Sequence, residues 1–300
     1  MAQDYLESIK KLGLTVKTNE PLAKYTTFKI GGPADFFVEV GEEEKLLKLI
    51  KLLKELKLPY FILGGGSNLL VADEGFRGMV IKMSNVKCQM SNEKIIVGAG
   101  VSLGRLVELA SKNSLAGLEF AAGIPGTVGG AVRGNAGAWG QAIGDRVKRV
   151  KILTPQGEIK WIKASDCHFS YRQSRFKKTK EIILEVELEL EKGNKKEIQE
   201  KISQNLAKRA TQPKEPSAGC IFVNPKPFAA GELIDKCGLK GKRIGDAQIS
   251  PKHANFIVNL GKAKAAEVIK LIKLIKEKVK EKFGVELEEE ISLLGFANLL

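Results

Sequence analysis

A glycine-rich segment at residues 121–140 constrains the fold more than any other part of this 300-residue chain. Seven of its twenty residues are glycine, and Arg133 carries its only charge. Glycine costs more backbone entropy to order than any other residue, so such a run is kept where bare backbone is useful. One use is the close approach of backbone N–H groups to an anion such as a phosphate. The alternative is a flexible linker, but residues of a packing type separate the glycines, namely Ile124, Val128, Val132 and Trp139.

A second glycine loop follows a short apolar strand that we expect at residues 60–63. Gly64, Gly65 and Gly66 come next, and an apolar stretch resumes at residue 69. Two such loops suggest one extended phosphate-bearing ligand that is held from two sides. Neither G-x-G-x-x-G nor G-x-x-x-x-G-K-[ST] occurs, so a dinucleotide here does not bind in a Rossmann or P-loop manner.

The composition is that of a globular protein, with 43% hydrophobic and 28% charged residues. The formal net charge is +14, but lysines alternate with glutamates, as at residues 42–57, which is typical of a solvated surface. Aromatic residues make up only 6% of the chain, and no basic stripe is interleaved with them, so we expect no nucleic-acid partner.

Targeting and metal signals are missing. The N-terminus lacks the apolar run of a signal peptide, and no apolar stretch reaches the ~18–20 residues that span a bilayer. Four cysteines form no C-x-x-C and there are only two histidines, so we expect neither a disulfide framework nor a metal site. These features predict a cytoplasmic protein without membrane or metal partners.

Hydrophobic periodicity predicts alternating helices and strands. Asp4 is the expected N-cap of a first helix, and Ser102 that of another. The strand at 182–190 alternates strictly, which predicts one buried face and one half-exposed face of glutamates. The expected helices cover residues 6–14, 42–58, 103–112, 197–210, 230–236 and 263–283. The expected strands cover residues 35–40, 60–63, 78–83, 94–97, 147–153, 158–163, 182–190, 220–223, 255–260 and 285–294. The strands at 147–153 and 158–163 are expected to form a hairpin around the turn at residues 154–157. Two prolines at residues 212–217 mark the clearest boundary, and we divide the chain into residues 1–83, 84–210 and 211–300.

Three residues have sequence neighbours that are compatible with a catalytic or ligand-binding role. Arg172 lies among Ser and Tyr with little acid nearby, where a guanidinium could clamp a carboxylate or phosphate; the alternative is a surface arginine. Cys220 stands between glycine and apolar residues, and its alternative is plain core. Glu290 enters an apolar run, although glutamates at 288–290 would ordinarily form a solvated turn.

From Thr26 to Gly295 the chain resembles the MurB family, the UDP-N-acetylenolpyruvoylglucosamine reductases. Its motifs are T-x-x-I-G-G-P-A-D at 27–35, L-G-G-G-S-N-L-L at 63–70, A-G-I-P-G-T-V-G-G-A at 122–131, N-A-G-A at 135–138, S-Y-R-x-S at 170–174, S-A-G-x-x-F-x-N-P at 217–225, G-L-K-G at 238–241, K-H-A-N-F-I-V-N at 252–259 and E-I-x-x-x-G at 290–295. Their number and common order make a chance match very improbable.

The resemblance implies an α+β fold with a two-subdomain FAD-binding module of the vanillyl-alcohol-oxidase or PCMH type, and a C-terminal α/β substrate domain. It implies noncovalent FAD and NADPH as the hydride donor, and the short chain is similar to the type II form. The implied FAD-binding residues are Ile30, Gly31, Gly32, Leu63, Gly64, Gly65, Gly66, Ser67, Asn68, Leu69, Ala122, Gly123, Pro125, Gly126, Gly129, Gly130, Asn135, Ala136 and Gly137.

The implied reaction is reduction of UDP-N-acetylglucosamine enolpyruvate to UDP-N-acetylmuramate, a step in peptidoglycan precursor synthesis. Hydride goes to C3 of the enolpyruvyl group, Arg172 and Glu290 hold the carboxylate, and Cys220 protonates C2. Beside a carboxylate, Glu290 would need a raised pKa in order to be protonated. The implied substrate-binding residues are Tyr171, Asn224, Lys240 and His253. No obligatory protein partner is expected.

Two positions depart from the family pattern. Better-known members carry serine at the position of Cys220, but a thiol is more acidic than a hydroxyl and is a plausible proton donor. Val223 stands where lysine is common, which leaves Lys240 or Lys252 to take over one substrate contact. An FAD oxidase of the same superfamily acting on another alcohol or sugar is the main alternative, but no histidine lies in the N-terminal glycine loops for covalent flavin attachment.

Overall fold

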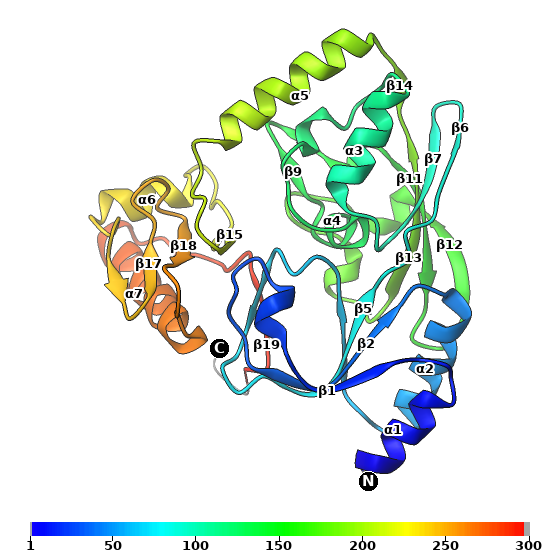
Figure 1. Cartoon of the computed structure of the whole chain (residues 1–300). Helices are drawn as coiled ribbons and strands as arrows, with labels where there is room; N and C mark the ends of the chain where they lie inside the picture. The colour runs from blue at the N-terminus through cyan, green and yellow to red at the C-terminus, as the bar shows by residue number, and fades with distance from the viewer. Residues whose placement is uncertain (1, 297–300) are drawn as a thin grey trace. The chain divides into compact units, whose positions relative to one another are not determined.

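The computed structural model describes residues 2–296 and separates into two compact units. Unit 1 comprises Met1–Lys17, Phe36–Gly65 and Gly78–Arg209, and unit 2 comprises Thr18–Asp35, Gly66–Arg77 and Ala210–Leu300. Figure 1 shows the course of the chain. The segments of unit 2 are therefore far apart in the sequence. The division into three domains stays a prediction.

The first part of unit 1 packs two helices against a small sheet. The helices are α1 (Ala2–Lys10) and α2 (Glu43–Glu55), and the strands are β1 (Val16–Pro21), β2 (Pro33–Val40), β3 (Tyr60–Leu63) and β5 (Phe76–Met83) in the order β1-β2-β5-β3. The apolar stripe of α2 is fully buried, as its periodicity predicts. The helix α1 begins at Ala2, so the prediction that Asp4 is its N-cap is wrong.

The second part of unit 1 is built on a five-stranded antiparallel sheet. Its order is β12-β11-β13-β7-β6, with β6 (Cys88–Ser91), β7 (Lys94–Gly98), β11 (Val147–Leu153), β12 (Ile159–Lys163) and β13 (Ile182–Glu189). The predicted hairpin of β11 and β12 is confirmed. The expectation of a half-exposed face on β13 is wrong at Glu187, which is 8% exposed and pairs with Arg149 at 2.5 Å. The strand is central in the sheet, and the ion pair lets the carboxylate be buried.

Short elements and three helices complete unit 1. The helices are α3 (Leu103–Lys112), α4 (Val128–Gly134) and α5 (Lys195–Arg209), and Ser102 caps α3 through a bond from the Arg105 N–H at 3.2 Å, as predicted. The short elements are β8 (Leu115–Ala116), β9 (Gly137–Ala138), β10 (Gln141–Ala142), β14 (Glu191–Lys192), η2 (Glu119–Ala121), η3 (Ile143–Asp145), η4 (Ala164–Cys167) and η5 (Arg175–Lys177).

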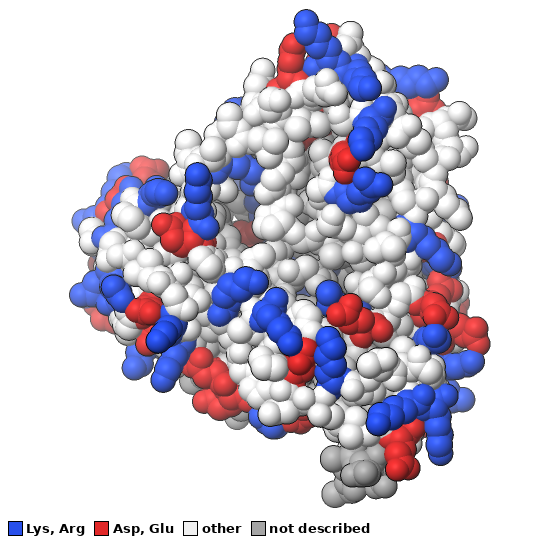
Figure 2. All heavy atoms as spheres, in the orientation of Figure 1, with Lys and Arg blue, Asp and Glu red and all other residues white. Residues whose placement is uncertain are grey.

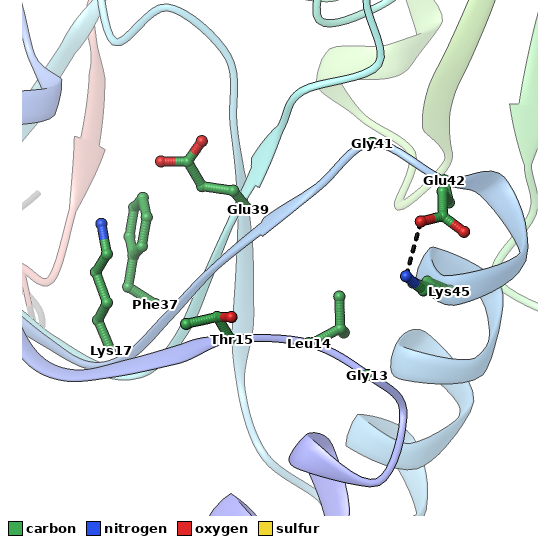
Figure 3. Close-up of a pocket in the computed structure, with 9 residues that line it drawn as sticks. All are labelled: Gly13, Leu14, Thr15, Lys17, Phe37, Glu39, Gly41, Glu42 and Lys45. Atoms are coloured by element: carbon green, nitrogen blue, oxygen red, sulfur yellow. Dashed lines mark hydrogen bonds and ion pairs between the residues drawn. The ribbon is translucent and has the colours of Figure 1, made fainter.

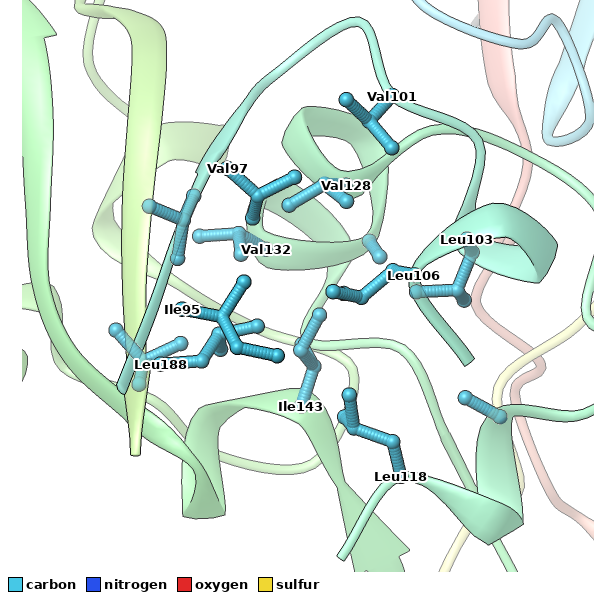
Figure 4. Packing of buried hydrophobic residues seen from close by; sticks show 14 of the residues in the cluster. Ile95, Val97, Val101, Leu103, Leu106, Leu118, Val128, Val132, Ile143 and Leu188 are labelled. Carbon is cyan, nitrogen blue, oxygen red and sulfur yellow. The ribbon is translucent and has the colours of Figure 1, made fainter. Parts of the chain in front are cut away.

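The helix α4 lies inside the glycine-rich segment and was not predicted. Thr127 caps it by accepting the Gly130 N–H at 3.4 Å. Val128 and Val132 are fully buried and point into the core beneath the loop (Figure 4). The packing that these residues predict is therefore confirmed, and the segment is not a flexible linker.

Unit 2 joins early loops of the chain to the C-terminal segment. It contains β4 (Leu69–Val71), which pairs in parallel with β19 (Ser292–Leu294), and a four-stranded sheet β15-β18-β17-β16. Its remaining elements are η1 (Leu22–Tyr25), β15 (Ser217–Cys220), β16 (Arg243–Ile244), β17 (Ala247–Ile249), β18 (Phe256–Asn259), α6 (Ala230–Lys236) and α7 (Ala265–Phe283). Phe28, Ile30 and Leu70 belong to the same hydrophobic core as α7.

Charges of both signs are mixed on the surface, as the alternation of lysine and glutamate predicts. Figure 2 shows blue and red side chains side by side on the visible face. On α2, for example, Lys48 pairs with Glu44 at 2.6 Å and Lys45 with Glu42 at 2.7 Å. No helix in the described range 2–296 combines the length and apolar character of a membrane span.

Candidate active site

The two glycine loops meet inside unit 1. A Cβ atom added to Gly64 would lie 2.6 Å from Thr127 Oγ1, and one added to Gly65 would lie 2.6 Å from Gly126 Cα. Both distances are too short for a real side chain, so only glycine allows this approach. The expectation that the two loops serve one site is consistent with this contact.

The contact leaves polar backbone at the surface. Within residues 2–296, the N–H groups of Gly65 and Gly126 donate no hydrogen bond to a protein acceptor. Gly65 is exposed and Gly126 is half-buried. Unbonded N–H groups on glycine backbone, where no side chain blocks the approach of a ligand, are suitable donors to a phosphate or diphosphate. The residues present therefore fit the diphosphate of a dinucleotide cofactor.

The candidate arginine stands in a tight turn that is fixed by neighbouring motifs. Ser170 and Gln173 exchange backbone hydrogen bonds at 3.0 and 3.1 Å, and Arg172 between them has a left-handed φ of +56°. The Asn135 Nδ2 group donates to the Ser170 carbonyl at 2.8 Å, and the Ser174 hydroxyl donates to the Arg133 carbonyl at 2.6 Å. The N-A-G-A and S-Y-R-x-S motifs are thus parts of one structure.

The side chain of Asn135 forms hydrogen bonds through both of its polar atoms. Its Oδ1 atom accepts the Gly144 N–H at 3.0 Å while its Nδ2 atom holds the Arg172 turn. Its own φ is +44°, a conformation that asparagine tolerates better than most residues. Its contact with the cofactor stays a prediction, and no local sequence pattern indicates its role in holding this turn.

Trp139 corrects one sequence expectation. We expected it to pack among the glycines, but it is 49% exposed and has a φ of +56°. Lys208 lies 5.1 Å from its ring centroid and Arg209 lies 5.9 Å from it. The aromatic character predicts a buried ring, but this ring is stabilised at the surface by cation–π contacts with the two basic side chains.

Unit 2 brings four of the sequence motifs together. Thr27 donates from its N–H to the Gly66 carbonyl at 3.1 Å and from its hydroxyl to the Ser217 carbonyl at 2.7 Å. Asn68 donates from Nδ2 to the Glu290 carbonyl at 3.0 Å and accepts the Ser292 N–H at 3.0 Å. The end of the triple-glycine loop at Gly66 and Asn68 is therefore tied to the backbone that bears two candidate catalytic residues, Cys220 on β15 and Glu290 just before β19.

Cys220 and Glu290 lie close together along paired backbone. The Glu290 N–H donates to the Ile221 carbonyl at 2.7 Å, next to Cys220, and Phe222 forms a bridge with Glu289. A bulge precedes Cys220, where Gly219 has a φ of +77°. Both candidate side chains are half-buried. Plain core is therefore not the setting of Cys220.

The predicted substrate-binding residues of unit 2 already have partners. Asn224 Oδ1 accepts the Ala230 N–H at 2.9 Å at the start of α6, and Lys240 pairs with Asp235 at 2.6 Å. His253 Nδ1 accepts the Asn255 N–H at 3.3 Å, and burial lowers the pKa of its imidazole, so its neutral form is favoured. Their substrate contacts, and that of the exposed Tyr171 in unit 1, stay predictions.

The other three cysteines all have raised thiol pKa values. Burial raises the pKa of the Cys167 thiol to about 11, and partial desolvation raises the pKa values of the exposed Cys88 and the half-buried Cys237 as well.

A pocket of about 350 Å³ between α2 and the N-terminal strands of unit 1 contains none of the predicted site residues (Figure 3). Its lining residues are Gly13, Leu14, Thr15, Lys17, Phe37, Glu39, Gly41, Glu42 and Lys45.

The fold and loops define a class of protein. Residues 34–163 match the family model described as FAD binding domain. A berberine bridge enzyme shares the fold at 16% identity, with a TM-score of 0.51 over 64% of this chain and 44% of that chain. The chain is therefore a flavoprotein with the FAD-binding module that the resemblance implies.

The family follows from closer matches. Residues 212–294 match the model of the UDP-N-acetylenolpyruvoylglucosamine reductase C-terminal domain. The reductase of that name from Halalkalibacterium halodurans is 44% identical over 98% of this chain and 99% of its own length. The crystal structure of UDP-N-acetylenolpyruvylglucosamine reductase (MurB) from Thermus caldophilus is 38% identical, with a TM-score of 0.81 over 94% of this chain and 98% of that chain. The chain belongs to the UDP-N-acetylenolpyruvoylglucosamine reductase family and is an FAD-dependent oxidoreductase.

Alanine at Gly65 is expected to weaken FAD binding. The added Cβ would push against the Gly126 backbone at 2.6 Å and separate the two loops. We expect the dissociation constant of FAD, measured by titration of apoprotein, to rise at least ~10-fold, which corresponds to ~1.4 kcal/mol. Gly104→Ala is the matched control, because its Cβ would meet nothing within 4 Å on the surface of α3. Equal affinities in the two variants would contradict the loop assignment.

Proposed function

We propose that this protein reduces UDP-N-acetylglucosamine enolpyruvate to UDP-N-acetylmuramate with NADPH, and that Arg172, Cys220 and Glu290 are its catalytic residues. The observation that carries the proposal is the hydrogen-bond network of unit 2. In that network Thr27 and Asn68 tie the triple-glycine loop to the backbone on which Cys220 and Glu290 lie. A cofactor loop and two chemically suited side chains are thus held by one framework.

The glycine backbone of both loops would hold FAD through its diphosphate, principally at Gly64, Gly65 and Gly126 of unit 1 and at Gly66 and Ser67 of unit 2. When bound, FAD that has been reduced by NADPH supplies the hydride for the enolpyruvyl group. The chain's own residues bind the carboxylate, favour charge development on it and deliver the proton.

Arg172 is suited to the carboxylate because its guanidinium is always charged and presents parallel N–H donors. Negative charge that develops on the enolpyruvyl carboxylate during reduction is stabilised by this fixed cation. Glu290 in its protonated form donates a further hydrogen bond to the same group. The tight turn that Asn135 and Ser174 fix keeps the arginine pre-organised.

Cys220 delivers the proton to C2. An ordinary thiol has a pKa of ~8.5 and is mostly protonated near neutral pH, so it is ready to act as a general acid. The resulting thiolate recovers a proton from solvent before the next turnover. NADPH and nucleotide-activated sugars are cytoplasmic metabolites, so we place the enzyme in the cytoplasm, acting without an obligatory protein partner.

The carboxylate itself can be tested without changing the protein. An enolpyruvyl substrate whose carboxylate is converted to the methyl ester has no anion for Arg172 to hold. We expect kcat/KM for the ester, followed by NADPH oxidation under anaerobic conditions, to be at least ~100-fold lower than for the acid. Comparable values for ester and acid would show that carboxylate recognition is not part of the mechanism.

A further inference from the structure

The helix α5 is attached to unit 1 by polar contacts more than by apolar packing. Ile198 is its only buried residue in the described chain, and Ile202 is partly buried. The helix, yellow-green in Figure 1, ends at Arg209. Its C-terminal part contacts η2, at whose last residue, Ala121, the glycine-rich segment begins. A helix with so small an apolar face depends on its other contacts for its position.

Two side chains of α5 bind three carbonyl groups of the segment that leads into the glycine loop. Asn205 donates from Nδ2 to the Glu119 carbonyl at 2.9 Å. Arg209, four residues later and thus on the same helix face, donates from Nε to the Ala122 carbonyl at 2.8 Å and from Nη2 to the Phe120 carbonyl at 3.4 Å. These bonds fix the backbone from 119 to 122.

The next residue of the loop is also in contact with α5. Gly123 has a φ of +76°, and a Cβ added to it would lie 2.8 Å from Arg209 Cδ and 3.1 Å from Leu206 Cδ2. The backbone at 119–123 therefore follows the surface of the helix closely. Three residues later is Gly126, whose N–H group has no acceptor in the described part of the chain and is proposed to bind phosphate.

We propose that Asn205 and Arg209 are positioning residues that set the conformation of the FAD-binding loop. The proposal rests on the proposed role of that loop in binding FAD. Neither residue needs to touch the cofactor. By holding three carbonyl groups, they keep the loop backbone in the geometry that presents the Gly126 N–H, and so they lower the cost of ordering the loop when FAD binds.

The test is the affinity of apoprotein for FAD, measured by flavin fluorescence at a temperature at which all variants are folded. We expect the dissociation constant to rise about 10-fold in Arg209→Ala and about 3-fold in Asn205→Ala. Arg209→Lys should fall between wild type and Arg209→Ala, because one N–H donor can still reach the Ala122 carbonyl. Lys201→Ala and Gln204→Ala are the matched controls, since both residues are exposed on the same helix.

Urea unfolding of each apoprotein separates positioning from stability. A purely structural role would lower the unfolding midpoint and leave the FAD dissociation constant of the folded protein unchanged, which would overturn the proposal. If Arg209→Ala does not fold, Asn205→Ala decides the question by the same criterion. Gly65→Ala distinguishes the two levels of failure. Weak FAD binding in Gly65→Ala together with normal binding in both α5 variants rejects only the positioning role, whereas normal binding in all three rejects the loop assignment as well.

Discussion

Replacing Cys220 with alanine is expected to lower kcat by ~10²–10⁴-fold, because it removes the general acid that protonates C2. Serine at the same position is expected to retain activity within ~10-fold, since a hydroxyl can replace the thiol in this role. The measurement is steady-state NADPH oxidation with the enolpyruvyl substrate. Flavin content and the rate of flavin reduction by NADPH should be unchanged in both variants.

Cys88→Ala is the matched control for Cys220→Ala. Cys88 is an exposed cysteine on β6 in unit 1 and has no role in the proposed site. It should turn over at the wild-type rate. Full turnover by Cys220→Ala would remove Cys220 from the mechanism and leave a water molecule or another side chain as the proton donor.

Replacing Arg172 is expected to cost ~10²–10³-fold in kcat/KM, the usual loss for a donor that stabilises developing charge. The choice of variant matters, because Arg172 has a left-handed φ of +56°. Alanine would combine the loss of charge with backbone strain, whereas asparagine tolerates this conformation and removes only the cation. Arg172→Asn is therefore the informative variant, and Arg172→Lys should restore part of the activity.

Arg105→Ala is the control for Arg172→Asn, because Arg105 is an exposed arginine on α3 that pairs with Glu108. The ester substrate adds a second check. If Arg172 acts on the carboxylate, Arg172→Asn should use acid and ester with similar efficiency. A variant that still prefers the acid as strongly as wild type would contradict the assigned role.

The local elements could be predicted from the sequence because their signals are local. The apolar spacing of α2, the Ser102 cap of α3 and the turn between β11 and β12 depend on neighbouring residues only, and the structure confirms each of them. The resemblance added what local patterns could not give, namely the flavin, the reductase family and the fold, and the comparisons confirm all three.

The pairing of strands that are far apart in the sequence could not be predicted from local patterns. The strand β4 pairs in parallel with β19, more than two hundred residues away, and this pairing places residues of the triple-glycine loop in unit 2 with the C-terminal segment. Each strand contributes three apolar or small residues to the pairing, and nothing in these six residues indicates which strand each one pairs with. The turn-holding role of Asn135 and the contacts of Arg209 are hidden for a similar reason, because each depends on carbonyl groups remote in sequence.

Helix α4 was missed for a different reason. Its sequence contains three glycines in seven residues, and glycine is a poor helix former. Tertiary burial of Val128 and Val132, together with the Thr127 cap, outweighs that low propensity. Trp139 shows the converse, because its aromatic character predicts burial while nearby cations and a left-handed backbone keep it at the surface.

The most direct test of the account is a pair of half-reactions on the purified, FAD-loaded protein without oxygen. NADPH should bleach the visible absorbance of the flavin, and addition of UDP-N-acetylglucosamine enolpyruvate should restore it with formation of an equal amount of UDP-N-acetylmuramate. UDP-N-acetylglucosamine, which lacks the enolpyruvyl group, should leave the flavin bleached. A flavin that NADPH reduces but that the enolpyruvyl substrate cannot reoxidise would leave the FAD-binding fold in place and contradict the proposed reaction.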